Sequence, residues 1–252
     1  GISMRILEFG DQSKPMLLLI HGFQCPWQVW EAYIQHYQAD YHVLVPILSG
    51  HDPEHPEDFE SFARDAQAIE DYIIPRYGHQ VHGVYAMSMG GVLAATLWQN
   101  QKLAFDRVIF DGSPLVSCGK LVKGFMERFY LMITHKCQQR DAKSLRQATQ
   151  VLVPEEKLDV LLAVLDQMTD ATVINSISGI ADFRLKTDVD TKSTQLCFFH
   201  GTAANEMLAK QSAKLLRKHY PSTMVKCFKG KFHCEDALFH PERIIAELDA
   251  IW

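Results

Sequence analysis

The sequence has no run of apolar residues approaching the roughly 20 that a membrane-spanning helix needs, although 47% of its 252 residues are hydrophobic. It also has no basic cluster of the kind that binds nucleic acid and no acidic tail, and its net charge of -5 is spread along the chain. Its first residues lack the basic and apolar regions typical of a signal peptide. We therefore expect no membrane span and no nucleic-acid partner, in a chain long enough to bury a sizeable core.

The six cysteines include no CxxC pair, and two of them, Cys197 and Cys227, lie within apolar runs. The two histidines nearest to cysteines, His135 and His233, are too close to them in the chain to form a metal site unaided. Reduced, buried thiols therefore explain the cysteines better than disulfides or zinc do. The sequence predicts a cytoplasmic location and no metal.

Short apolar runs alternate with longer segments in which apolar residues recur at helical spacing. The predicted strands are Met16–Ile20, 42–45, 81–86, 107–110, 196–199 and Met224–Phe228, each expected to be buried. The predicted helices between and after them are 27–39, 59–74, 89–99, 206–219 and 241–251. Such alternation indicates an α/β fold, in which a mostly parallel sheet carries helices on both faces.

Residues 115–190 interrupt the alternation, because they carry helical patterns and no strand pattern. The clearest pattern is PEEKLDVLLAVLDQM, with Pro154 at a helix start, acidic residues in the first turn and then a stripe of leucines. We expect this helical insertion to cap the carboxyl edge of the sheet, where ligands of such sheets bind. The core would then be 1–114 and 191–252. A helical decoration without a role at the site is the alternative.

The segment YAMSMGG places Ser88 between the predicted strand 81–86 and the predicted helix 89–99. A serine at a strand-to-helix reversal, surrounded by small residues, is typical of a strained turn that raises the hydroxyl above the sheet. Ala86 stands where glycine is commoner, and its single methyl group is the smallest possible departure. The competing interpretation is a serine N-cap followed by glycines that serve packing.

Two further segments favour a catalytic role for this serine. His21-Gly22-Phe23 follows the strand MLLLI, and the backbone N–H of Phe23 could join that of Met89 in a two-donor oxyanion hole. His233 lies in GKFH, between the last predicted strand and the last helix, and therefore at the same edge of the sheet. The order of serine before histidine, with acids between them, is the order this kind of site requires.

These motifs together resemble the α/β-hydrolase superfamily over nearly the whole sequence. The matching segments are LLLIHGF, PILSGHD, YAMSMGG, FFHG and GKFHCEDALFHPERI, with the helical insertion between the first three and the last two. The resemblance implies a sheet of the eight-stranded type, trimmed at its start. It also implies Ser88 as nucleophile, His233 as general base, and Phe23 and Met89 as oxyanion donors.

The third member of the implied catalytic triad is displaced from its usual place. In most relatives an aspartate lies three residues beyond the glycine of a motif like FFHG, and here that residue is Ala204. We predict that Asp111, in IFDGSP at the end of the strand after the serine turn, supplies the acid instead. A loop aspartate that caps its own backbone is the alternative for Asp111. Glu206 is the second candidate acid, although a first-turn carboxylate favoured by the helix dipole is its more ordinary role.

The leading functional hypothesis is a serine hydrolase that cleaves a small or medium carboxylic ester, or a related acyl bond, through an acyl-enzyme on Ser88. This chemistry requires a small-molecule acyl substrate and neither a metal nor an organic cofactor. The same triad could also perform C–C bond hydrolysis, lyase chemistry or acyl transfer. A weakly catalytic binding or signalling protein is a third possibility, which Ala204 suggests. The sequence does not define an oligomeric state.

Overall fold

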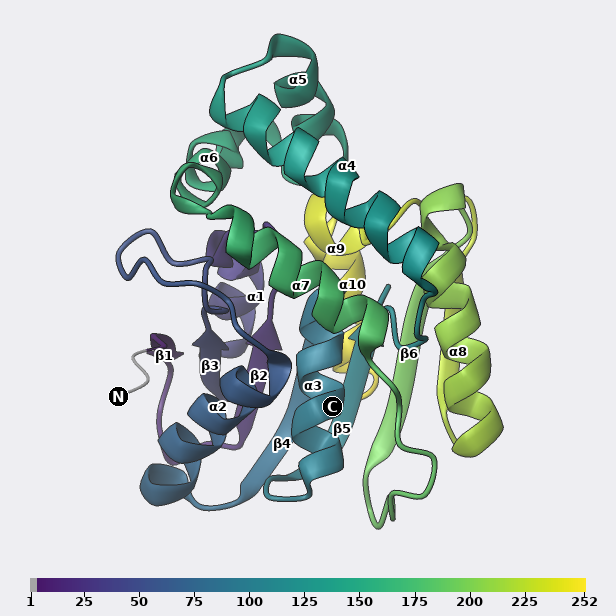
Figure 1. Ribbon diagram of the computed structural model, residues 1–252. Helices are drawn as coiled ribbons and strands as arrows, with labels where there is room; N and C mark the ends of the chain where they lie inside the picture. Colours follow the sequence, from purple (N-terminus) through teal and green to yellow (C-terminus); the bar gives the residue numbers. More distant parts are fainter. Residues whose placement is uncertain (1–3) are drawn as a thin grey trace.

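The computed structural model describes residues 4–252, and within them seven strands form one sheet in the order β1-β3-β2-β4-β5-β6-β7 (Figure 1). Strand β1 pairs antiparallel with β3, and all the other neighbouring strands are parallel. The strands are β1 (Ile6–Phe9), β2 (Met16–Ile20), β3 (His42–Pro46), β4 (Gln80–Met87), β5 (Ala104–Asp111), β6 (Gln195–Gly201) and β7 (Met224–Phe228). Residues 1–3 of the predicted core segment 1–114 lie outside the described residues.

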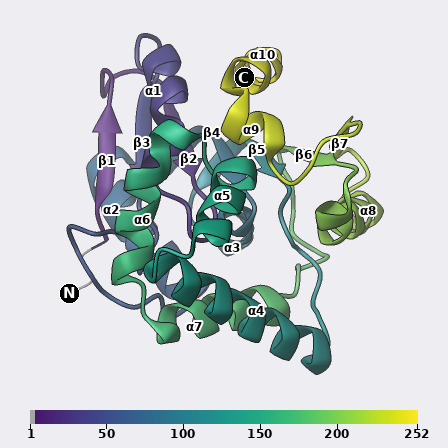
Figure 2. The same cartoon turned by 90° about the horizontal axis from the view of Figure 1, so that it is seen from above.

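Helices cover both faces of this sheet, because successive side chains of each strand point to opposite sides. Leu18, Ile20 and Leu44 pack against α2 (Phe62–Tyr77), α3 (Met89–Asn100) and α8 (Met207–His219). Leu17 and Val43 pack against α1 (Glu31–Tyr37) and α10 (Pro241–Asp249) on the other face. The remaining helices are α4 (Lys120–Gln138), α5 (Ala142–Val151), α6 (Leu158–Gln167), α7 (Asp170–Asp182) and α9 (Glu235–Phe239). Figure 2 shows α1 and α10 on the opposite side from α2 and α8.

The six predicted strands are present, but one of them is not buried. Strand β7 consists of exposed and half-buried residues, whereas β2 and β3 are buried throughout. The residues of β7 are more exposed because this strand lies at the edge of the sheet and pairs with β6 alone. An apolar run such as MVKCF therefore predicts a strand without predicting its place in the sheet.

Residues 115–190, all of which the structure describes, contain helices and loops and no strand. Helices α4, α5, α6 and α7 connect β5 to β6 and lie above the carboxyl end of the sheet (Figure 1). Buried residues of α4, α5 and α6 share a hydrophobic cluster with the sheet: Cys137, Ala148, Leu161 and Leu165. The helical insertion is thus packed onto the core rather than separate from it.

Within the described residues 4–252, no single helix is long and apolar enough to cross a membrane. The segments Glu155–Gln167 and Asp170–Asp182 together have the length and apolar composition of a membrane span. They are bent by 98° at the break between them.

A pair of alanine substitutions tests how tightly α3 packs against β2. A Cβ atom on Gly90 would lie 2.5 Å from the backbone oxygen of His21 and 2.6 Å from that of Ile20. We expect Gly90→Ala to lower the free energy of unfolding by about 1–3 kcal/mol, because backbone atoms would have to move. Gly124→Ala is the matched control in α4, where a Cβ atom would meet no heavy atom within 4 Å.

The control should raise the free energy of unfolding by up to about 1 kcal/mol, which is the difference in helix propensity between the two residues. Urea unfolding of both variants gives the measurement. Equal effects at the two glycines would show that the close approach of α3 to β2 is not the constraint we describe.

Candidate active site

The turn between β4 and α3 holds Ser88 in a conformation that few non-glycine residues adopt. Its φ is +49° and its ψ is -121°. The backbone N–H of Ser88 donates to the backbone carbonyl oxygen of Asp111 at 2.7 Å. This bond connects the turn to the end of the neighbouring strand β5. A Cβ atom on Gly22 would lie 3.2 Å from the Cβ of Ser88. The turn predicted from YAMSMGG is therefore present, with the His21–Phe23 loop against it.

Two hydrogen bonds connect Ser88, His233 and Glu206 in a line. The Oγ of Ser88 lies 2.8 Å from Nε2 of His233, and Nδ1 of His233 lies 2.9 Å from Oε2 of Glu206. With Nδ1–H donating to the carboxylate, Nε2 is free to accept the serine proton. A hydroxyl, an imidazole and a carboxylate in this order can activate the hydroxyl as a nucleophile.

Glu206 reaches the histidine because a short 3-10 turn, Ala204–Glu206, precedes α8. The turn places the carboxylate, which is fully buried, under the histidine loop, where Oε1 also accepts from the backbone N–H of Gly201 at 2.9 Å. In the same turn, Oδ1 of Asn205 accepts from the backbone N–H of His233 at 3.1 Å. Burial raises the pKa of Glu206, but the hydrogen bond from His233 and the other donors outweigh burial and hold that pKa below its ordinary value.

The prediction that Asp111 is the partner of His233 is wrong in geometry. The Asp111 carboxylate accepts a hydrogen bond from the hydroxyl of Tyr85, which lies on the neighbouring strand β4. His233 stands instead over Gly112, where a Cβ atom would lie 2.8 Å from its Nδ1. The loop aspartate capping its own backbone is not what the structure shows either. Burial raises the pKa of Asp111 to about 7, although the Tyr85 hydrogen bond acts in the opposite direction.

Phe23 and Met89, the residues predicted to be the oxyanion donors, both lie close to Ser88. Met89 is the first residue of α3, where backbone N–H groups have no partner within the helix. Phe23 borders, together with Ser88, both of the cavities described below. Donation from their two backbone N–H groups to a carbonyl oxygen bound near Ser88 stays a prediction.

Two buried, neutral histidines hold the loop that carries Phe23. Nε2 of His21 accepts from the backbone N–H of Leu48 at 3.2 Å, and Nε2 of His51 accepts from that of Gln24 at 2.9 Å. Burial lowers the pKa of His21 to about 4 and that of His51 to about 3. A protonated ring could not accept these bonds, so the low pKa values keep the loop in place.

Gln24, which the sequence did not single out, links this loop to the helical insertion. Its backbone is left-handed, with φ +57°, and its side chain is 3% exposed. The Nε2 group of Gln24 donates to Oγ1 of Thr134 on α4 at 2.5 Å. The sequence around Gln24 does not indicate this contact, because Thr134 is 110 residues away in the chain.

Two cavities of unequal size meet at Ser88, Phe23 and His233. The smaller, about 50 Å³, is also lined by Gly22, Gln24, Cys25, Met87, Leu152, Cys234 and Leu238. The larger, about 120 Å³, is also lined by Gly112, Pro114, Met126, Tyr130, Ile177, Ile180, Asn205, Glu206, Leu208 and Ala209. Both linings are mainly apolar, and neither contains a lysine or an arginine among its described residues.

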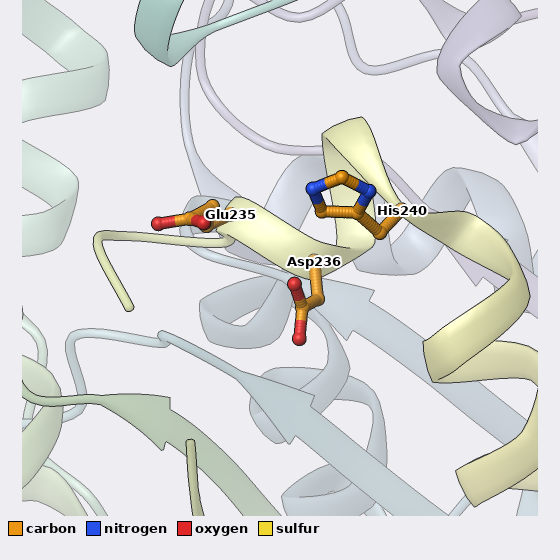
Figure 3. A group of neighbouring side chains, drawn as sticks. All are labelled: Glu235, Asp236 and His240. Atoms are coloured by element: carbon orange, nitrogen blue, oxygen red, sulfur yellow. The ribbon is translucent and has the colours of Figure 1, made fainter. Parts of the chain in front are cut away.

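Glu235, Asp236 and His240 form a separate group with metal-ligating side chains beyond His233 (Figure 3). Cationic side chains already serve its carboxylates, since Lys231 pairs with both acids and Arg243 with Asp236. Lysine and arginine side chains from outside the group therefore balance the charge of both carboxylates. All six cysteines, which lie in the described range, are free.

The parallel sheet, the serine at the β4–α3 turn and the histidine and acid after the last two strands define an α/β-hydrolase fold with a serine–histidine–acid site. A family model for the alpha/beta hydrolase family matches residues 17–220. The chain belongs to this family.

Solved structures of similar fold cover nearly the whole chain. An alpha/beta hydrolase family protein from Desulfitobacterium hafniense superposes with a TM-score of 0.78 at 19% identity, covering 98% of this chain and 99% of the other. A thermophilic esterase from Thermogutta terrifontis gives 0.74 at 15% identity, covering 98% and 92%. MenH from S. aureus gives 0.72 at 14% identity, covering 98% and 96%. At these identities the likeness concerns the fold.

A curated relative, Epoxide hydrolase 4 of Mus musculus, is 27% identical over 97 residues. The match covers 37% of this chain and 27% of the length of that protein.

Asp111→Asn should change the pH dependence of stability in a defined direction. The Asp111 pKa is about 7 in the folded protein, against an ordinary value of 3.8. The protonated carboxyl therefore stabilises the fold fully below pH 3.8, and this contribution is lost as the pH rises to about 7. The asparagine variant has no proton to lose at this position. Between these pH values the free energy of unfolding of the wild type should therefore fall, relative to that of the variant, by about 1.4 kcal/mol per pH unit.

Above about pH 7 the difference should level off. Urea unfolding of both proteins across the pH range gives the measurement. A difference that is constant from acid to neutral pH would contradict the raised pKa of Asp111.

Proposed function

We propose that this chain is a serine hydrolase that cleaves small or medium, uncharged carboxylic esters. The observation that carries the proposal is the pair of hydrogen bonds that joins Ser88, His233 and Glu206. The strained backbone of Ser88 supports it, and so do the positions of Phe23 and Met89, which lie close to this residue. An interaction protein that had lost catalysis would have no need to keep all of these parts together.

The reaction follows from the positions of these groups. Oγ of Ser88 attacks the ester carbonyl while Nε2 of His233 takes its proton, and the backbone N–H groups of Phe23 and Met89 stabilise the oxyanion. His233 then gives the proton to the leaving alcohol, and the acyl group remains on Ser88. A water molecule, activated by the same Nε2, releases the acid. Glu206 holds the ring and stabilises its positive charge in each transition state.

The two cavities support an ester with two apolar sides of different size. The carbonyl would lie at Ser88, with one side of the ester in each cavity. Cap helices supply part of both linings, since Met126 and Tyr130 belong to α4, Ile177 belongs to α7, and Leu152 follows α5. We therefore also propose that residues 115–190 act as a cap that selects substrates, over a core formed by 1–114 and 191–252.

C–C bond hydrolysis, lyase chemistry and acyl transfer would use the same three side chains. Aryl esters, 1,3-diketones and carbonates tested in parallel distinguish these reactions from ester hydrolysis. The cytoplasmic location stays a prediction from the cysteines.

The roles of the two acids predict a large difference between two isosteric variants. Glu206→Gln should lower kcat on an aryl ester by roughly 10⁴-fold, because the ring would lose its orientation and its compensating charge. Asp111→Asn should retain most of the activity, since the Asp111 carboxylate faces Tyr85 and not His233. Steady-state kinetics give the measurement, and Ser88→Ala provides the background rate.

If Asp111→Asn lowered kcat far more than Glu206→Gln, Asp111 would be the catalytic acid. Full activity in both would show that a serine–histidine pair suffices.

The cavity linings predict separable changes in substrate preference. Met126→Ala enlarges the larger cavity and Leu152→Ala the smaller one, and both residues are half-buried. Each variant should raise kcat/KM for longer groups on one side of the ester by about tenfold or more, a usual value for added methylene groups in an apolar pocket.

Two substrate series give the measurement, one with a varied acyl group and one with a varied alcohol. We expect the two variants to act on different series. If both variants change kcat/KM within the same substrate series, the cavities do not hold opposite sides of the ester.

A further inference from the structure

The outward face of α4 is apolar and basic, which is unusual for an exposed helix. Large apolar side chains protrude along it, with exposed fractions from 90% for Leu121 and 63% for Phe125 down to 42% for Phe129. The complete set of exposed residues in α4 is Lys120, Leu121, Val122, Phe125, Arg128, Phe129, Met132 and Lys136, which we call the α4 face. An ordinary surface helix shows the reverse pattern, with its apolar residues turned inward.

The acidic residue of α4 does not belong to this face. Glu127 is half-buried and accepts from the hydroxyl of Ser178 on α7 at 3.2 Å. Lys123 is also turned to α7, where it pairs with Asp182 at 2.9 Å. The α4 face therefore carries three basic residues and no acidic one, although the whole chain has a net charge of -5.

The two phenylalanines form a flat apolar surface. The rings of Phe125 and Phe129 are stacked, with centroids 6.4 Å apart and planes at 14°. Met207, 62% exposed, begins α8, and its neighbour Leu208 lines the larger cavity together with Met126 of α4. Figures 1 and 2 show α4 on the outside of the molecule, above the end of the sheet at which β4 leads into α3.

We propose that the α4 face binds the surface of an anionic lipid bilayer. Apolar side chains would enter the boundary between headgroups and acyl chains, and the basic residues would pair with the headgroups. A second copy of the chain fits this face less well, because a twofold contact would bring the basic residues of both copies together. An anionic lipid surface satisfies both the apolar and the basic members of the face.

The charge distribution also orients the molecule on such a surface. An anionic bilayer repels a chain with a net charge of -5 in general but attracts the α4 face, so this side approaches first. The larger cavity, lined by Met126 and Tyr130 of the same helix, then lies on the inner side of that helix, with the α4 face on its outer side. The binding itself does not depend on the proposed ester hydrolysis.

Co-sedimentation with vesicles tests the proposal on the whole chain of 252 residues. We expect binding to phosphatidylcholine vesicles that contain phosphatidylserine, weak binding to phosphatidylcholine alone, and a loss of binding at high salt. Arg128→Glu should weaken binding by more than about fivefold, which is the contribution of one basic residue near such a surface. Lys214→Glu, an exposed lysine of α8, is the matched control for the change of charge and should bind almost as the wild type does.

Phe125→Ser tests the apolar part and should reduce binding about tenfold or more, since burying a phenylalanine contributes about 1.5–3 kcal/mol. Met224→Ser is the matched control, because Met224 is 53% exposed on β7, away from the helical insertion. Circular dichroism establishes that each variant is folded. Unchanged binding of Phe125→Ser, equal binding to both vesicle types, or no binding would overturn the proposal. So would a dimer that Phe125→Ser dissociates in a protein that does not bind vesicles.

Discussion

The left-handed backbone of Ser88 is the constraint on which the rest of the site depends. A non-glycine residue at φ +49° costs on the order of 1–3 kcal/mol, so the surroundings must hold it there. The bond from its N–H to Asp111 fixes one side of the turn. On the other side Gly22 and Gly90 let the backbone of β2 and its loop approach closely. The position of the Ser88 hydroxyl beside His233 is a consequence of this packing.

The position of the oxyanion loop depends on both the core and the helical insertion. His21 and His51 fix the loop to the segment that follows β3, through bonds that require neutral rings. Gln24 fixes it to Thr134 of α4. A shift of α4 would therefore move the loop that carries Phe23, the proposed oxyanion donor. This connection gives the helical insertion a physical means to influence the chemistry at Ser88 as well as access to it.

The sequence predicted the sheet, the serine turn and the histidine because each leaves a local pattern, such as MLLLI, YAMSMGG and GKFH. The acid leaves no such pattern. Choosing Asp111 rested on β5 running beside β4 in the same direction, which it does, but the Asp111 side chain turns to Tyr85. Choosing Glu206 required knowledge that Ala204–Glu206 forms a 3-10 turn and that a longer side chain then reaches His233. Contacts such as Gln24 with Thr134 depend on tertiary packing alone.

Two buried carboxyls near one histidine would repel each other if both were ionised, and their surroundings separate them. Glu206 accepts from two N–H groups, those of His233 and Gly201, which favour its charged form. Asp111 faces the Tyr85 hydroxyl in an apolar setting, and burial raises its pKa to about 7. Such a division of environments is how active sites give two carboxyls different charge states. Below neutral pH, His233 therefore has one ionised carboxylate beside it, the one that its own N–H group contacts.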